Sequence, residues 1–216
     1  MHNKLLKKRL ELERMMGVDV LPVAAGLETR LEQIEQEVRA CTACRLHETR
    51  TQGVFARGDP HSELMFVGEA PGADEDEQGV PFVGRAGRLL DRLIFAMGLE
   101  RDAVYVTNIL KSRPPNNRDP RADEVEACFP YLERQIELIQ PRIICTLGLP
   151  AARGLLGGNR SMGSMRGKWQ SFRGIPLLPT YHPAYLLRQP SQKKKVWWDL
   201  KKLILALKHG PPKVLF

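Results

Sequence analysis

Short apolar segments alternate with helical patterns from Glu63 almost to the end of the 216-residue sequence. The strand candidates are residues 64–67, 104–106, 143–147 and 175–178. Helical apolar spacing follows over residues 89–97, 125–139 and 196–207, and Cys128 falls on the buried face of the second of these segments. Such alternation is typical of a parallel sheet whose two faces are covered by helices. We therefore expect an α/β fold.

The amino-terminal part of the chain does not join this alternation. Residues 3–16 mix leucines with basic residues, which predicts an amphipathic helix, and residues 17–26 indicate a linker. A second helix is predicted from Leu27 to Val38, where apolar residues recur at 4-3-4 spacing, and it should pack on the main domain. We divide the chain into a basic helical extension and linker (1–34), a main domain (35–210) and a tail (211–216).

Each unusual loop of the sequence follows one of the four predicted strands. In chain order these loops read GEAPGADEDEQGVPFVG, TNILKSRPPNNR, LGLPAARGLLG and TYHPAYLLRQP. In open parallel sheets, ligands bind beyond the carboxyl ends of the strands. We therefore expect the four loops to converge on one crevice.

The charge balance favours a polyanionic partner. The chain has 33 Lys and Arg residues against 25 Asp and Glu residues, a formal net charge of +8. Neutralised phosphates release counterions and so add affinity for nucleic acid, although a solvated basic surface has the same composition. No window approaches the 18 apolar residues of a membrane span, and the first residues lack a secretory apolar core. We expect a cytoplasmic monomer that binds no membrane.

The first loop places carboxylates beside the expected site of a basic protein. Glu69 stands in the turn GEAPG, and the run ADEDE follows it. Carboxylates there would repel phosphate unless they hold Mg²⁺, activate water or face a developing cation. A solvated loop is the alternative for Asp74, Asp76 and Glu77, which leaves Glu69 as the strongest candidate.

Two further residues suit the recognition of a flat, polar ring. Phe82, in PFVGRAG, precedes a helix at the lip of the crevice, where it can stack on a base or simply fill the core. Asn108 ends the second strand, and its amide can both accept and donate a hydrogen bond to one edge of a base. The alternative for Asn108 is an ordinary strand-end cap.

The fourth loop, YHPAYLLR, combines three kinds of side chain. His182 ends a strand and is followed by a proline, so it can donate a hydrogen bond to a departing anion, although a lone histidine is more often structural. Leu186 or Leu187 can wedge into a base stack, although leucines in a helical turn usually pack in the core. Arg188 can bind a phosphate.

Taken together, GEAPG, PFVGRAG, TNILK-RPP-NR and YHPAYLLR resemble the loops of family 4 uracil-DNA glycosylases, iron–sulfur members of the uracil-DNA glycosylase superfamily. The resemblance extends from about residue 37 to residue 207. It implies a three-layer α/β domain with a central four-stranded parallel sheet, a flipped uracil in the crevice and a [4Fe-4S] cluster. The implied substrate is uracil-containing DNA, single- or double-stranded, and the implied process is base excision repair.

The resemblance also implies roles for the residues at matching positions. Phe82 would stack on uracil, Asn108 would read its edge, and His182 would stabilise negative charge on O2. Glu69 would position or activate water. The remaining implied site residues are Glu75 and Asn117, as a supporting pair, and Ala70, near the place where thymine is excluded.

The cysteines are where the sequence departs from this family. Four cysteines in a chain expected in the cytoplasm indicate metal or redox chemistry, and Cys41-x2-Cys44 is a thiolate pair suited to a metal. The resemblance makes Cys41, Cys44 and Cys128 three cluster ligands, but Ser112 stands where the family has a cysteine. The fourth ligand is then either Cys145 or the serine itself. The remaining alternatives are an incomplete, labile cluster and a Zn²⁺ ion in a remodelled site.

The expected chemistry matches these side chains. When a glycosidic bond stretches, the sugar becomes oxocarbenium-like and the base leaves as an anion, so a carboxylate and hydrogen-bond donors on opposite sides stabilise the separated charges. This hydrolysis requires no cofactor. A Mg²⁺-dependent nuclease that uses the acidic loop and a non-enzymatic nucleic-acid binder are the competing hypotheses.

Overall fold

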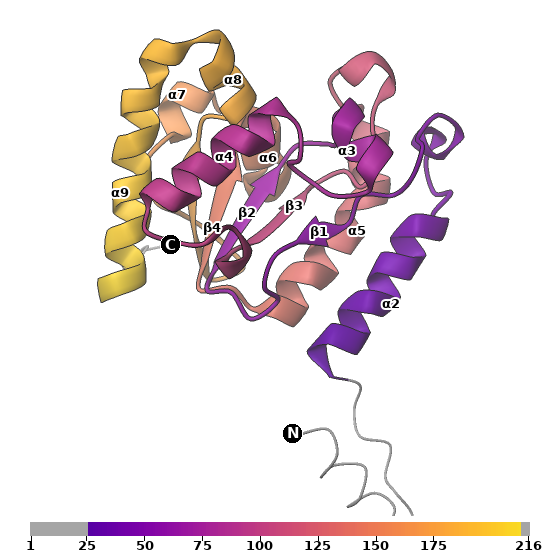
Figure 1. The fold of residues 1–216 in the computed structure, drawn as a ribbon, viewed down its shortest axis with the longest axis horizontal. Helices are drawn as coiled ribbons and strands as arrows, with labels where there is room; N and C mark the ends of the chain where they lie inside the picture. The colour runs from indigo at the N-terminus through magenta and orange to yellow at the C-terminus, as the bar shows by residue number, and fades with distance from the viewer. Residues whose placement is uncertain (1–25, 213–216) are drawn as a thin grey trace, which may run out of the picture.

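The computed structural model describes residues 26–212 and shows a six-stranded sheet between two layers of helices (Figure 1). The strands are β1 (Ala56–Arg57), β2 (Leu64–Gly68), β3 (Tyr105–Asn108), β4 (Ile143–Leu147), β5 (Gln170–Phe172) and β6 (Ile175–Thr180). The α-helices are α2 (Leu27–Ala40), α3 (Ala73–Gln78), α4 (Arg85–Ala96), α5 (Ala122–Ile139), α6 (Leu149–Leu156), α7 (Met162–Met165), α8 (Pro183–Arg188) and α9 (Lys193–His209). Four 3-10 helices are η1 (Arg45–Glu48), η2 (Arg101–Ala103), η3 (Pro115–Asn117) and η4 (Pro190–Gln192).

The expected parallel sheet is confirmed and has two additional edge strands. The strand order is β1-β3-β2-β4-β6-β5, in which the four predicted strands are mutually parallel and β1 and β5 pair antiparallel at the two edges. The expected central set of four parallel strands is therefore present, and the edge strands bring the sheet to six. The β5–β6 hairpin turns through Arg173 (φ 48°) and Gly174 (φ 84°). Two consecutive positive φ angles are the signature of a tight type I′ turn, so Arg-Gly was the missed signal.

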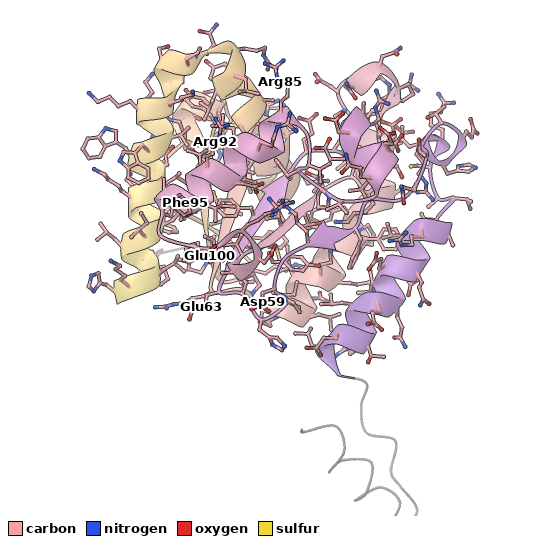
Figure 2. The ribbon with its side chains drawn as sticks, viewed as in Figure 1. Asp59, Glu63, Arg85, Arg92, Phe95 and Glu100 are labelled. Atoms are coloured by element: carbon pink, nitrogen blue, oxygen red, sulfur yellow. The ribbon has the colours of Figure 1, made fainter. Side chains whose placement is uncertain are left out.

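Side-chain alternation along the central strands builds one core on each face of the sheet. Leu64 and Phe66 of β2 pack toward α4 and α9, whereas Met65 and Val67 pack toward α2, α5 and α6. All five residues of β2 are buried, as a strand covered on both faces requires. The outer side of α4 is exposed, and Figure 2 shows Arg85, Arg92 and Phe95 projecting from it. The three layers are those that the sequence predicts.

Helix α2 belongs to the main domain. Its buried residues Leu31, Ile34 and Val38 share the core that contains α5. The helix predicted at Leu27–Val38 is thus confirmed, and it continues across the boundary placed between residues 34 and 35. The helix predicted at residues 3–16 and most of the tail lie outside the described residues.

Candidate active site

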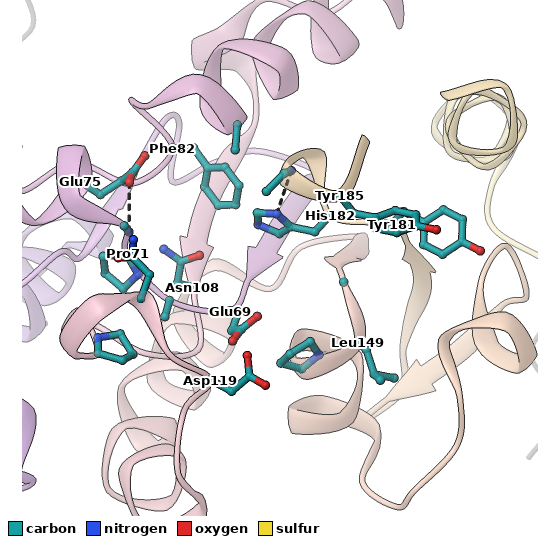
Figure 3. Close-up of a pocket in the computed structure, with 18 of the residues that line it drawn as sticks. Glu69, Pro71, Glu75, Phe82, Asn108, Asp119, Leu149, Tyr181, His182 and Tyr185 are labelled. Atoms are coloured by element: carbon teal, nitrogen blue, oxygen red, sulfur yellow. Dashed lines mark hydrogen bonds between the residues drawn. The ribbon is translucent and has the colours of Figure 1, made fainter. Parts of the chain in front are cut away.

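A pocket of about 740 Å³ opens where the parallel strands end. All four long loops contribute to its wall, which confirms that they converge on one crevice (Figure 3). The expected site residues in the wall are Glu69, Ala70, Glu75, Phe82, Asn108, Asn117, His182 and Arg188. Leu149 and Pro150 come from the third loop, and Tyr181 and Tyr185 flank the histidine.

Phe82 lies in the pocket wall in a backbone conformation that side chains rarely adopt. Its φ angle is 57°, its side chain is 5% exposed, and its ring centroid lies 5.6 Å from that of His182. Two glycines make this placement possible. A Cβ on Gly68 would lie 2.6 Å from the Phe82 ring, and one on Gly87 would lie 1.7 Å from the Phe82 carbonyl oxygen. The two glycines thus give the Phe82 turn the space that its backbone conformation needs. Backbone conformations of this kind are common at functional sites.

Asn108 offers the pocket an amide with unused hydrogen-bonding capacity. Its side chain is 2% exposed, and Oδ1 is buried without a hydrogen-bond partner among the described residues. Gly68 again provides the space, because a Cβ there would lie 2.2 Å from this oxygen. Burying an acceptor without a partner is costly, so a ligand that donates to Oδ1 would recover that cost.

Glu69 is a half-buried carboxyl group whose pKa is raised to about 7, first by burial and second by the charge of Asp119. Figure 3 shows the carboxyl groups of Glu69 and Asp119 directed toward each other across the pocket floor. A pKa near neutrality suits a general base. Sequence reasoning missed Asp119, although it directly follows the loop singled out after β3.

His182 is poised to donate a hydrogen bond into the pocket. It is the N-cap residue of α8, where its Nδ1 accepts a hydrogen bond from the Ala184 backbone N–H at 3.1 Å. Burial, with a smaller contribution from Arg188, lowers the pKa of His182 to about 4. The ring is therefore neutral at pH 7, and because Nδ1 accepts, the proton resides on Nε2.

Glu75 accepts hydrogen bonds from backbone N–H groups at the starts of two helices. Its Oε2 accepts from the Gly72 N–H at 3.0 Å, and its Oε1 accepts from the N–H groups of Val83 at 3.0 Å and Gly84 at 2.8 Å. This carboxylate thereby joins the start of α3 to the start of α4. The structure places Glu75 in the pocket wall, as expected, with its oxygens used to hold the loop.

Asn117 and Asp76 also use their side chains in hydrogen bonds within the protein. Asn117, the residue expected to pair with Glu75, accepts a hydrogen bond from Arg113 Nε at 2.8 Å. Asp76 is 3% exposed and accepts from the backbone and side chain of Thr51. The acidic loop is therefore partly structural, and the solvated alternative for Asp76 is wrong.

Helix α8 separates the two leucines that sequence reasoning could not distinguish. Leu186 is 0% exposed and packs in the core between α4 and α9, which favours the core alternative for this residue over a wedge in DNA. Leu187 is 38% exposed, and Arg188 is exposed at the pocket mouth. Of the two leucines, Leu187 is the one that solvent reaches.

A second, much smaller cavity of about 10 Å³ collects the three expected cysteine ligands. Cys41, Cys44, Cys128 and Ser112 all line it. The Lys111 backbone N–H donates to Cys128 Sγ at 3.1 Å, the kind of contact that stabilises a metal-bound thiolate. The three cysteines that the resemblance assigns to a cluster thus line one cavity.

The fourth position departs from that pattern. Arg50 Nη1 donates to Ser112 Oγ at 2.7 Å and Nη2 donates to the Cys41 carbonyl oxygen at 2.8 Å. Within residues 26–212, no three His, Cys, Asp or Glu side chains are grouped closely enough to hold a metal ion. Cys145 is excluded as a replacement, because it lies in the core on the α4 and α9 face of the sheet. Cys128 lies instead with Leu46 and Leu110.

The strand ends of this open α/β sheet carry Phe82, a neutral His182 and Asn108, whose Oδ1 has no hydrogen-bond partner among the described residues, and this combination suits a flat, polar ring. The family model described as "Uracil DNA glycosylase superfamily" matches residues 55–201. This chain belongs to that superfamily.

None of the helices in the described part of the chain is long and apolar enough to cross a membrane.

Individual relatives agree with the family match. A type-4 uracil-DNA glycosylase of Sulfurisphaera tokodaii is 48% identical over 182 residues, which cover 80% of this chain and 83% of the relative. One of Saccharolobus solfataricus is 46% identical over 190 residues, covering 84% and 88%. One of Thermotoga maritima is 41% identical over 182 residues, covering 82% and 91%.

Proposed function

We propose that this protein is a uracil-DNA glycosylase that flips uracil out of DNA and hydrolyses its N-glycosidic bond, leaving an abasic site. The single observation that carries the proposal is the buried, unpaired Oδ1 of Asn108 in a pocket that also holds Phe82 and His182. Its similarity to type-4 uracil-DNA glycosylases supports the same reaction.

The proposed recognition follows from hydrogen-bond polarity. Uracil has an N3–H that Oδ1 of Asn108 can accept and an O4 to which its Nδ2 can donate, whereas cytosine presents the opposite pattern. The Phe82 ring supplies a stacking surface, worth about 1–3 kcal/mol for an extruded base. Ala70 lines the same pocket and is our candidate for the contact that excludes the thymine methyl group.

The proposed bond cleavage separates two charges. His182 Nε2–H donates to O2 of the departing uracil anion, and because the ring is neutral it does so without needing a low pH. Glu69, when ionised, activates or positions the water that attacks C1′, and its negative charge favours the oxocarbenium-like sugar. Glu75 supports the reaction by holding the Phe82 turn, with Asn117 beside it in the pocket wall.

The DNA partner is proposed from surface features around the pocket. Arg188, exposed at the mouth, would bind a phosphate, and the exposed Leu187 would fill the gap left by a flipped base. The four cysteines are free thiols, which suits the reducing cytoplasm. We propose that the protein works there as a monomer on uracil-containing DNA, single- or double-stranded.

An iron–sulfur centre is proposed for the small cysteine cavity, with Cys41, Cys44 and Cys128 as its ligands. Support comes from the three thiols that share the cavity and from the amide donor on Cys128. The centre would have a structural role, because the hydrolysis needs no redox chemistry. The fourth ligand is the weakest position, since serine oxygen is a harder donor than thiolate and Arg50 already binds it.

The decisive experiment incubates the protein with a uracil-containing oligonucleotide in the presence of a chelator. We expect free uracil and alkali-labile abasic sites. Chain breaks that require added Mg²⁺ and leave no abasic intermediate would instead support the nuclease. The structure disfavours the nuclease because Glu75, which lines the pocket, and Asp76, which is buried, already accept hydrogen bonds from backbone N–H groups.

A further inference from the structure

A buried lysine lies directly behind the base-reading asparagine. Lys111 is 1% exposed, and its Nζ lies 2.7 Å from Thr107 Oγ1, 2.7 Å from the Asn108 carbonyl oxygen and 2.6 Å from Gln135 Oε1. An ammonium group has three N–H donors, so the three acceptors match its full capacity. The lysine thereby connects the end of β3 to α5.

The acceptors around Lys111 are themselves held in place. Thr107 Oγ1 donates its proton to the Phe55 carbonyl oxygen at 2.8 Å, which leaves its lone pairs for the lysine. Gln135 Nε2 donates to the Tyr105 hydroxyl at 2.9 Å, which directs Oε1 toward Nζ. Three acceptor oxygens at hydrogen-bond distance from Nζ suit the ammonium form of the lysine.

This arrangement is costly if it serves only to fill the core. An apolar side chain of similar volume commonly replaces a buried charge without loss of stability. What the ammonium adds is a fixed position for the Asn108 carbonyl. The Asn108 side chain gains no such support, because its Oδ1 is unpaired among the described residues. The direction of its amide therefore depends on its own backbone.

We propose that Lys111 is a positioning residue for uracil recognition, which holds the Asn108 backbone so that the side-chain amide faces the base in the selective orientation. This inference rests on the proposed function. The lysine touches no substrate and acts only through Asn108. A displacement of about 1 Å at a positioned group costs about 100-fold in rate, which sets the scale of the expected effect.

The first test is a double-mutant cycle on single-turnover uracil release. Lys111→Met should lower the rate by up to about 100-fold with a smaller change in DNA affinity. In the Asn108→Ala background the same substitution should cost almost nothing, because the group that it positions is gone. An equal loss in both backgrounds would show a general structural role and overturn the proposal.

A matched pair at Thr107 covers the case in which Lys111→Met does not fold. Thr107→Val removes one acceptor of the ammonium while keeping the side-chain shape, and Thr107→Ser keeps the hydroxyl. We expect Thr107→Val to lower the rate of uracil release and Thr107→Ser to stay close to wild type. Equal rates for the two variants would overturn the proposal.

A readout that needs no substrate separates this inference from the proposed function. The Asn108 side-chain amide gives a pair of NMR signals, assigned by their loss in Asn108→Ala. These signals should shift or broaden in Lys111→Met and Thr107→Val but not in Thr107→Ser. If the wild type releases no uracil, the proposed function fails while the signals still test the positioning. Signals unchanged in every variant would overturn the inference even in an active enzyme.

Discussion

The base pocket and the cysteine cavity lie on the same chain, and they use their polar groups in opposite ways. In the pocket, Asn108 Oδ1 has no hydrogen-bond partner among the described residues, and the backbone contact of His182 uses Nδ1, which leaves the Nε2 proton for a ligand. In the cysteine cavity, Ser112 is bound by Arg50, and Cys128 accepts the Lys111 N–H. The pocket therefore retains hydrogen-bonding groups for a ligand. In the cavity, by contrast, the hydroxyl at the fourth ligand position, Ser112, is already bound by Arg50.

This difference shows which part of the family pattern the reaction depends on. The pocket preserves every side chain that the resemblance assigns to uracil, and the cavity lacks one thiol of the four assigned to the cluster. Hydrolysis of the glycosidic bond needs the pocket groups alone. Substitutions in the pocket should therefore change the rate strongly, and substitutions in the cavity should change metal content more than rate.

The largest effect is expected at Glu69. Because burial and Asp119 raise its pKa to about 7, the ionised base is fully present above that pH and is lost as the pH falls below it. The rate of uracil release should rise with pH up to about 7 and then level off. Glu69→Gln should abolish this rise of the rate with pH and lower the rate by about 100- to 10,000-fold.

Asp119→Asn is the matched control for this profile, because it removes the neighbouring negative charge. The pKa of Glu69 should fall, and the rise of the rate should move to lower pH while the rate at high pH is retained. If the rate of Glu69→Gln still rises with pH up to about 7, another group causes the pH dependence.

The next effect concerns the two residues that act on the flipped base. Asn108→Ala and His182→Ala should each lower the chemical rate by about 100- to 1000-fold, the usual cost of one lost donor to a developing anion. DNA binding should weaken less, since neither side chain is placed for a phosphate. Single-turnover kinetics and a binding titration on the same uracil-containing oligonucleotide measure the two quantities. A loss of binding that matches the loss of rate would contradict this division.

A smaller effect is expected at the rim of the pocket. DNA affinity should fall with salt, because each phosphate contact contributes a slope of about −0.9 in log K against log salt concentration. Arg188→Ala should reduce that slope by about 1. Arg173 is a suitable control, because it is paired with Glu133 and Glu137 on α5, at the β5–β6 turn. A slope that is unchanged by Arg188→Ala would remove this residue from the DNA contact.

The smallest effect on rate is expected in the cysteine cavity. Anaerobically purified protein should contain iron and sulfide, Cys128→Ser should lower both, and Ser112→Cys should raise their retention. Cys145→Ser should leave the iron content unchanged, because this thiol faces the opposite core. Wild-type protein with neither iron nor sulfide would defeat the iron–sulfur proposal and leave the glycosylase proposal intact.

The sequence by itself determined the sheet, its order of secondary structure and the edge at which the pocket lies. Apolar runs such as residues 143–147 are strands because they are buried on both faces, and parallel connections bring the following loops to one edge. Phe82, Asn108 and His182 were predicted from the same loops, and the structure brings them together in one pocket. The edge strands β1 and β5 escaped notice because two or three residues carry no periodic signal.

Only the tertiary structure decided how each polar side chain is used. Leu186 and Leu187 are neighbours in one helical turn, and packing against α4 and α9 buries the first and exposes the second. Cys145 lies in the core under α4 and α9, whereas Cys128 lies with Leu46 and Leu110. The spacing of the cysteines in the sequence does not reveal this difference. Glu75 holds backbone amides, Asp119 faces Glu69, and Lys111 supports Asn108. These roles depend on how the loops and helices pack against one another, so they arise only when the chain has folded.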